Sequence, residues 1–118
     1  MYAVADRIRG IGRQVVVHTD RFAPGTDDVV WLKGLAGSGY ILLTKDGRIR
    51  RRPLERFALC AAGIDAFFLG NRQIRGDTMA EAFVRAIPRI ERMVAQSEAP
   101  VWGSVHLDGR VTLLKVDG

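Results

Sequence analysis

The chain has 118 residues and a mass of 13.0 kDa, which fits one domain spanning residues 1–118. Hydrophobic residues make up 47% of it, which argues against disorder, and its single cysteine excludes an internal disulfide and a cysteine-based zinc cage. The net charge of +5 favours a polyanionic partner such as nucleic acid, with a merely solvated basic surface as the alternative.

The first half of the chain alternates expected helices with expected buried strands. Apolar side chains at i, i+4 and i+7, starting from Val4, predict a helix at the beginning of the chain. The β-branched run at 14–18 predicts a buried strand. A second helix is expected after Thr26, which can serve as its N-cap, with Val30 on its apolar face. The run at 40–43 then predicts a second buried strand.

The second half continues this alternation and closes with a hairpin. A helix is expected to start near Pro53. It is marked by the apolar residues Leu54, Phe57, Ala58 and Ala61. A third strand is expected at 66–69, and a capping box that starts at Thr78 predicts a long helix to about Gln96, kinked at Pro88. Phe83, Val84, Ile87 and Ile90 should face inward on this helix. Strands at 101–107 and 111–116 flank Asp108 and Gly109, a pair typical of a type I′ turn.

This order predicts an α/β protein. Helices that alternate with buried strands indicate a three-layer α/β/α sandwich with a mainly parallel sheet, and the C-terminal β-hairpin adds an antiparallel edge. No apolar stretch approaches about 18 residues, so we expect no membrane span. Charged residues interrupt the N-terminus before a signal peptide could form, so we expect a cytoplasmic protein.

Acidic residues follow two of the expected strands. Asp20 comes shortly after the strand at 14–18, and Asp46 shortly after the strand at 40–43. Asp27 and Asp28 open the helix between them, and this helix start should face the same edge of the sheet. Carboxylate oxygens suit Mg²⁺ or Mn²⁺, which can activate water and stabilise a phosphoryl transition state. The alternatives are helix N-terminal acids for Asp27 and Asp28, and an Asp-Gly turn for Asp46.

A basic run lies beside this predicted metal site. Residues 45–52, KDGRIRRR, carry five cations and one acid. A phosphate backbone drawn to the run would pass close to the metal. The residues expected to bind RNA are Lys45, Arg48, Arg50 and Arg51. A solvated loop or a patch for an acidic protein partner is the alternative.

Two long stretches, HTDRFAPGTDDVVWL at 18–32 and ILLTKDGRIRRRPLE at 41–55, resemble the PIN-like domain of VapC-type toxin ribonucleases. The segment at 87–93 and the closing hairpin are similar too. The resemblance implies a small α/β/α sandwich that cleaves RNA with Mg or Mn. It also implies a homodimer that a cognate antitoxin neutralises. Asp28 and Asp46 match acids of the family's metal site, and Arg48 and Arg50 match the basic positions that follow.

The sequence departs from the family pattern at its beginning. The family has an initial strand ending in an acid ahead of the first helix, and this sequence starts with the helix. We expect the absent strand to leave a gap in the sheet. A start codon assigned too far downstream, a truncated and weakly active paralogue, and completion of the sheet by another chain are three explanations. In a fourth, residues 2–6 form the strand and Asp6 is the acid.

Three functional hypotheses follow. The first is a metal-dependent endoribonuclease of a toxin–antitoxin system, in which Asp28 and Asp46 are catalytic and, with Asp27, hold the metal. The second is a catalytically degraded module that binds RNA or an antitoxin without turnover. The third is a nucleotide- or phosphate-binding regulatory domain with the same type of sheet.

Overall fold

The computed structural model describes residues 2–13, 28–37, 39–44, 51–69, 76–98 and 100–116. Its helices are α1 (Tyr2–Gly10), α3 (Asp28–Gly34), α5 (Pro53–Ala61) and α6 (Gly76–Ala95). Its strands are β1 (Leu42–Thr44), β2 (Ala66–Phe68), β3 (Trp102–Val105) and β4 (Val111–Leu114). The strand expected at 14–18 lies outside the described residues.

The strands form one sheet in the order β1-β2-β3-β4. The first three strands are parallel, and β4 pairs antiparallel with β3, which confirms the predicted mainly parallel sheet and its C-terminal hairpin. Neighbouring strands pair directly, so the expected gap is wrong for the four described strands. The alternative that made residues 2–6 a strand is also wrong, because these residues form the first part of α1.

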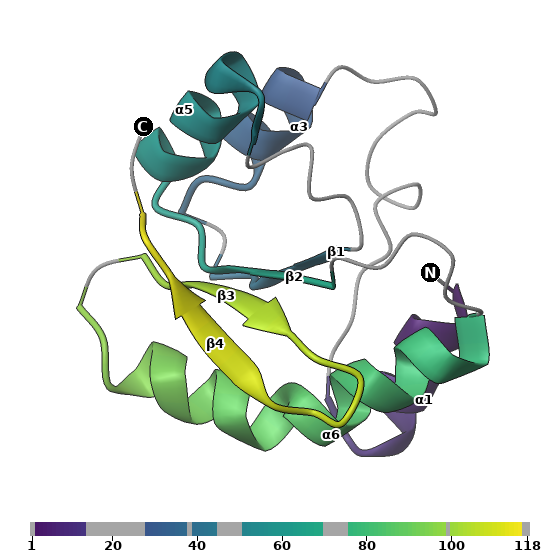
Figure 1. Ribbon diagram of the computed structural model, residues 1–118. Helices are drawn as coiled ribbons and strands as arrows, with labels where there is room; N and C mark the ends of the chain where they lie inside the picture. The colour runs from purple at the N-terminus through teal and green to yellow at the C-terminus, as the bar shows by residue number, and fades with distance from the viewer. Residues whose placement is uncertain are drawn as a thin grey trace.

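The helices cover both faces of the sheet, as expected for a three-layer sandwich (Figure 1). On one face, α1 and α6 pack on a core that contains Phe67. On the other, α3 and α5 pack on a core that contains Phe68 and the fully buried Trp102. Phe67 and Phe68 enter opposite cores because successive side chains of a strand point to opposite faces.

Helix α5 starts as predicted, with Pro53 in its first turn, but most of its apolar stripe is not part of the core. Leu54, Phe57 and Ala61 are exposed, whereas Ala58 and its neighbour Leu59 are buried. In α3, Leu32 is buried, whereas Val30, which the sequence placed on the apolar face of this helix, is exposed. Each helix buries only one narrow face, and the sequence offers more apolar residues than that face can hold.

Two element boundaries differ from the predicted ones. Strand β1 spans 42–44 rather than 40–43, and its side chains are half-buried because β1 is the last described strand at one side of the sheet. Helix α6 begins at Gly76, before the expected cap Thr78, and the Thr78 backbone N–H donates to Asp77 Oδ1 at 2.9 Å. Phe83, Ile87 and Ile90 are buried as predicted.

The hairpin turn is not of type I′. That turn needs positive φ at both central residues, and Gly109 has φ 91° whereas Asp108 does not have a positive φ. The Gly109 N–H donates to the His106 carbonyl at 2.9 Å, and the His106 N–H donates to the Arg110 carbonyl at 2.8 Å. These bonds define a three-residue loop with a glycine bulge, which also suits an Asp-Gly pair.

No helix in the described part of the chain is both long enough and apolar enough to cross a membrane.

Candidate functional site

The carboxyl ends of the parallel strands meet at one edge of the sheet. Strand β1 ends at Thr44 and β2 ends at Phe68, and the two strands are in register at these residues. Beyond them, the Leu69 backbone N–H donates to the Thr44 carbonyl at 2.8 Å, which holds the two chain ends together. In a sheet of this kind, binding and catalytic residues gather at this edge.

Two helices begin at the same edge. Strands β1 and β2 are parallel, and α5 connects them along the chain. The connection must therefore return along one face of the sheet from the end of β1 to the start of β2, so residues 51–53 lie near the end of β1. Figure 1 shows α3 beginning on the side of the molecule towards which β1 and β2 run. The backbone of Asp28, the first residue of α3, therefore lies at the same edge as Thr44, which is followed two positions later by Asp46.

The structure places the predicted site residues only in part. Asp27 and Asp46 lie outside the described residues, and for Asp28 the structure describes the backbone alone. The predicted RNA-binding residues Lys45, Arg48 and Arg50 lie outside as well, whereas Arg51 is described and exposed. The meeting of Asp28 and Asp46 at one metal thus stays a prediction. The candidate acid Asp20 also lies outside the described part.

Two described carboxylates close to the sheet and to α5 have structural partners. Asp65 Oδ1 accepts the Val101 backbone N–H at 2.8 Å, which fixes the start of β3. Arg52 pairs with Glu55 at 3.7 Å. Within the described ranges, no three His, Cys, Asp or Glu side chains group closely enough to hold a metal ion. Asp28, Asp27 and Asp46 thus remain the candidate ligands, and as hard carboxylates they suit Mg²⁺ or Mn²⁺.

Two exposed carboxylates have pKa values below the usual range for reasons unrelated to a metal. Glu91 accepts two hydrogen bonds from the Arg13 guanidinium, at 2.8 and 3.0 Å, and these bonds lower its pKa. Asp108 Oδ1 accepts the Arg110 backbone N–H at 3.0 Å, which is the main cause of its lowered pKa. Glu91 lies on α6, whereas Asp108 lies in the hairpin loop after β3, a strand parallel to β2 and in register with it.

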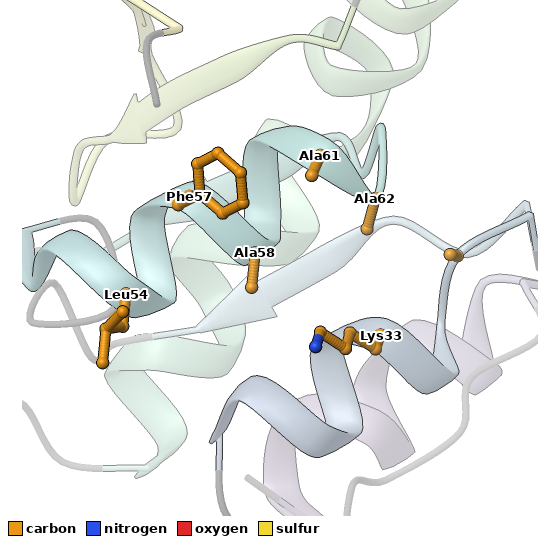
Figure 2. Close-up of a pocket in the computed structure, with 7 residues that line it drawn as sticks. Lys33, Leu54, Phe57, Ala58, Ala61 and Ala62 are labelled. Atoms are coloured by element: carbon orange, nitrogen blue, oxygen red, sulfur yellow. The ribbon is translucent and has the colours of Figure 1, made fainter.

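A second feature, which the sequence did not predict, is an apolar pocket between α3 and α5 (Figure 2). Its volume is about 350 Å³. Alanines form much of its lining, with Leu54 and Phe57 from α5 and Lys33 from α3. The stripe at 54, 57, 58 and 61 was visible in the sequence. The exposure of Leu54, Phe57 and Ala61 could not be predicted from the sequence, because helix periodicity does not say which apolar side chains meet the sheet.

The fold and this edge define an α/β domain with a predicted acidic site at the carboxyl ends of parallel strands. A family model described as a PIN like domain matches residues 2–71, more than half of the chain. The chain therefore belongs to the PIN-like domain family, part of a nuclease-like superfamily whose members typically use divalent metals. No match was found among curated proteins or among solved structures.

The matched range confirms part of the predicted resemblance. It runs from α1 to just beyond β2 and includes Asp28, Asp46 and the basic run at 45–52. It ends before α6, so the last helix and the hairpin belong to the fold on structural grounds alone.

Proposed function

We propose that this protein is a metal-dependent endoribonuclease of the toxin type, which hydrolyses RNA phosphodiesters. The observation that carries the proposal is the PIN-like match over residues 2–71, which spans both candidate aspartates. The position of the Asp28 backbone at the edge where β1 ends supports it, because Asp46 follows that strand end closely. A toxin of this kind would form a homodimer and be neutralised by a cognate antitoxin.

The two aspartates would hold the metal. Asp28 and Asp46, with Asp27 beside them, supply carboxylate oxygens from two separate segments. When bound, Mg²⁺ or Mn²⁺ supplies positive charge for the phosphoryl transition state and activates water. Asp28 and Asp46 contribute to catalysis by fixing that charge at the end of β1.

The basic run would hold the RNA backbone. Lys45, Arg48, Arg50 and Arg51 follow β1 directly, and Arg51 is exposed next to the start of α5. Arginine binds phosphate oxygens with a planar pair of donors, so the run can align RNA beside the aspartates. This binding should weaken steeply as salt rises. The logarithm of the binding constant should fall with the logarithm of the salt concentration, with a slope of about −0.7 for each phosphate contact to single-stranded RNA.

The experiment is RNA cleavage by the purified chain with Mg²⁺ or Mn²⁺. We expect cleavage that a chelator stops and that Asp46→Asn abolishes while the circular dichroism spectrum stays unchanged. Asp6→Asn is the matched control, because Asp6 is an exposed acid on α1 that pairs with Arg9 and is not among the proposed metal ligands, and it should keep full activity. Cleavage that survives both Asp46→Asn and excess chelator would reject the mechanism.

Measurements of RNA binding and of nucleotide binding, made beside the cleavage experiment, separate the three hypotheses. Salt-sensitive RNA binding with no turnover at any metal concentration would reject the nuclease and support the non-catalytic module. Calorimetric heat on titration with nucleotides, without RNA binding, would instead support the nucleotide-binding domain.

A further inference from the structure

Helix α5 exposes an apolar stripe that the rest of the described structure leaves uncovered. The side chains of Leu54 and Phe57 are 74% and 63% exposed, and Ala61 follows them on the same face. Two large apolar side chains exposed one helical turn apart form a contiguous apolar patch, and such patches are a feature of surfaces that bind a partner.

The stripe forms one wall of the pocket between α3 and α5. Ala58, Ala61 and Ala62 of the α5 side and Ala36 after α3 leave the space of about 350 Å³ unfilled. Figure 2 shows Lys33 on α3 across the pocket from α5, with Leu54 and Phe57 on α5 at its border. The small alanine side chains let the backbone of another chain approach closely, and the side chains of Leu54 and Phe57 can pack over the bound segment.

The charge around this pocket is positive. On α3 and on residues 51–61, four described side chains are basic and one is acidic. They are Lys33, Arg51, Arg52, Arg56 and the acid Glu55. Glu55 already pairs with Arg52 at 3.7 Å. Lys33 lines the pocket itself, and Arg51 is exposed three residues before Leu54, so these two cations can meet a partner. An apolar surface with a basic border is complementary to an apolar surface with an acidic border.

We propose that the pocket between α3 and α5 binds an amphipathic helix of a partner protein whose flanks are acidic. Helix α5 has nine residues and is about 13 Å long, so it can contact between two and three turns of such a helix. The partner's apolar residues would cover Leu54 and Phe57, and its acids would face Lys33 and Arg51. The proposal does not depend on the ribonuclease activity.

Two other occupants fit less well. A second copy of this chain would bring a second Lys33 and Arg51 to the same interface, where like charges repel. RNA bases need stacking surfaces and several polar groups, and this lining offers one aromatic ring and one lysine among alanines and a leucine.

The experiment uses a labelled helical peptide of about 18 residues as a probe, with leucines at i, i+3, i+4 and i+7 and glutamates on both flanks. A second peptide has lysine in place of every glutamate. Fluorescence anisotropy should show that the glutamate peptide binds at least about tenfold more tightly. Phe57→Ser and Leu54→Ser should each weaken it by about tenfold or more, and Lys33→Glu should reverse the preference between the peptides.

Leu113→Ser is the matched control, because Leu113 is 64% exposed but lies on β4, outside the pocket. It should bind the glutamate peptide like the unmodified protein. Equal binding of both peptides, or no effect of Phe57→Ser, would overturn the proposal. A dimer in sedimentation that Phe57→Ser dissociates would assign the pocket to a second copy. Displacement of the peptide by an RNA oligomer, with loss of RNA binding in Phe57→Ser, would assign it to RNA.

Discussion

Gly109 joins the tip of the hairpin to α6. Its carbonyl accepts a hydrogen bond from Arg89 Nη1 at 3.1 Å, and its φ of 91° lies where side chains are strained. A Cβ at this position would lie 2.6 Å from Arg85 Cβ and 3.2 Å from the Arg85 carbonyl carbon. The hairpin can approach α6 this closely only because residue 109 has no side chain.

Replacing Gly109 with alanine should therefore lower the free energy of unfolding by about 2–4 kcal/mol, from backbone strain and overpacking together. Gly63→Ala is the control, since Gly63 also has a positive φ but a Cβ there meets open space. It should cost about 1–2 kcal/mol. Urea denaturation measures both, and equal losses in the two variants would contradict the close contact with α6.

The Arg13–Glu91 ion pair connects the segment after α1 to α6. The guanidinium donates to both carboxylate oxygens, at 2.8 and 3.0 Å, and this hydrogen bonding lowers the Glu91 pKa. A carboxylate whose pKa is lower in the folded state stabilises that state above its unfolded pKa. The stabilisation is lost as pH falls through the folded pKa.

Glu91→Gln should thus be less stable than the unmodified protein at pH 7, and the difference should shrink as pH falls below about 4. The effect is small because the pair is exposed. Thermal denaturation at a series of pH values measures the difference, and a difference that grows towards acid pH would refute this assignment.

At the scale of elements, Pro88 is the clearest weak point of α6. The helix continues for seven residues beyond it, to Ala95, although proline cannot donate the backbone hydrogen bond to residue 84. The predicted kink at Pro88 stays a prediction. Pro88 is exposed, so its ring fills no core space.

Pro88→Ala should raise the free energy of unfolding by about 1–3 kcal/mol, because it restores a donor and improves helix propensity. Arg92→Ala, exposed on the same helix, should stay within about 0.5 kcal/mol of the unmodified protein. Urea denaturation of both variants checks this, and a loss of stability in Pro88→Ala would show that the proline fits a bend in α6 that alanine does not keep.

Sequence periodicity predicted which helices and strands form, but it did not always predict which side chains of a helix pack against the sheet. The spacing of Phe83, Ile87 and Ile90 predicted the buried face of α6 correctly, because this helix of 20 residues carries its apolar side chains along one continuous face. On the shorter α5, Leu59 is fully buried and Phe57 is exposed. That choice depends on packing against α3 and on Trp102 beneath it, and neither can be read from local sequence.

The predicted hairpin turn type and the predicted start of β1 were wrong for a related reason. The Asp108–Gly109 pair fits both a two-residue and a three-residue loop, and strand register decides between them. The start of β1 likewise depends on pairing, since Leu42 is its first residue aligned with β2.

At the scale of the whole molecule, the order of helices and strands was enough to predict the layers and the parallel sheet. The site could be predicted only to the level of segments. Topology brings the start of α3 and the end of β1 to one edge, whereas the positions of the Asp28 and Asp46 carboxylates depend on side-chain geometry that no sequence spacing fixes. The account therefore depends on whether these two residues share one ion.

Manganese binding tests that claim most directly, through the electron paramagnetic resonance signal of free Mn²⁺ during titration of the protein. Asp28→Asn and Asp46→Asn should each weaken binding by at least about tenfold, with Asp6→Asn unchanged. The fold-loss of Mn²⁺ affinity in the double variant should be smaller than the product of the fold-losses in the two single variants, because both aspartates act on one ion. Unaltered Mn²⁺ binding in either single variant would contradict a shared metal site at the end of β1.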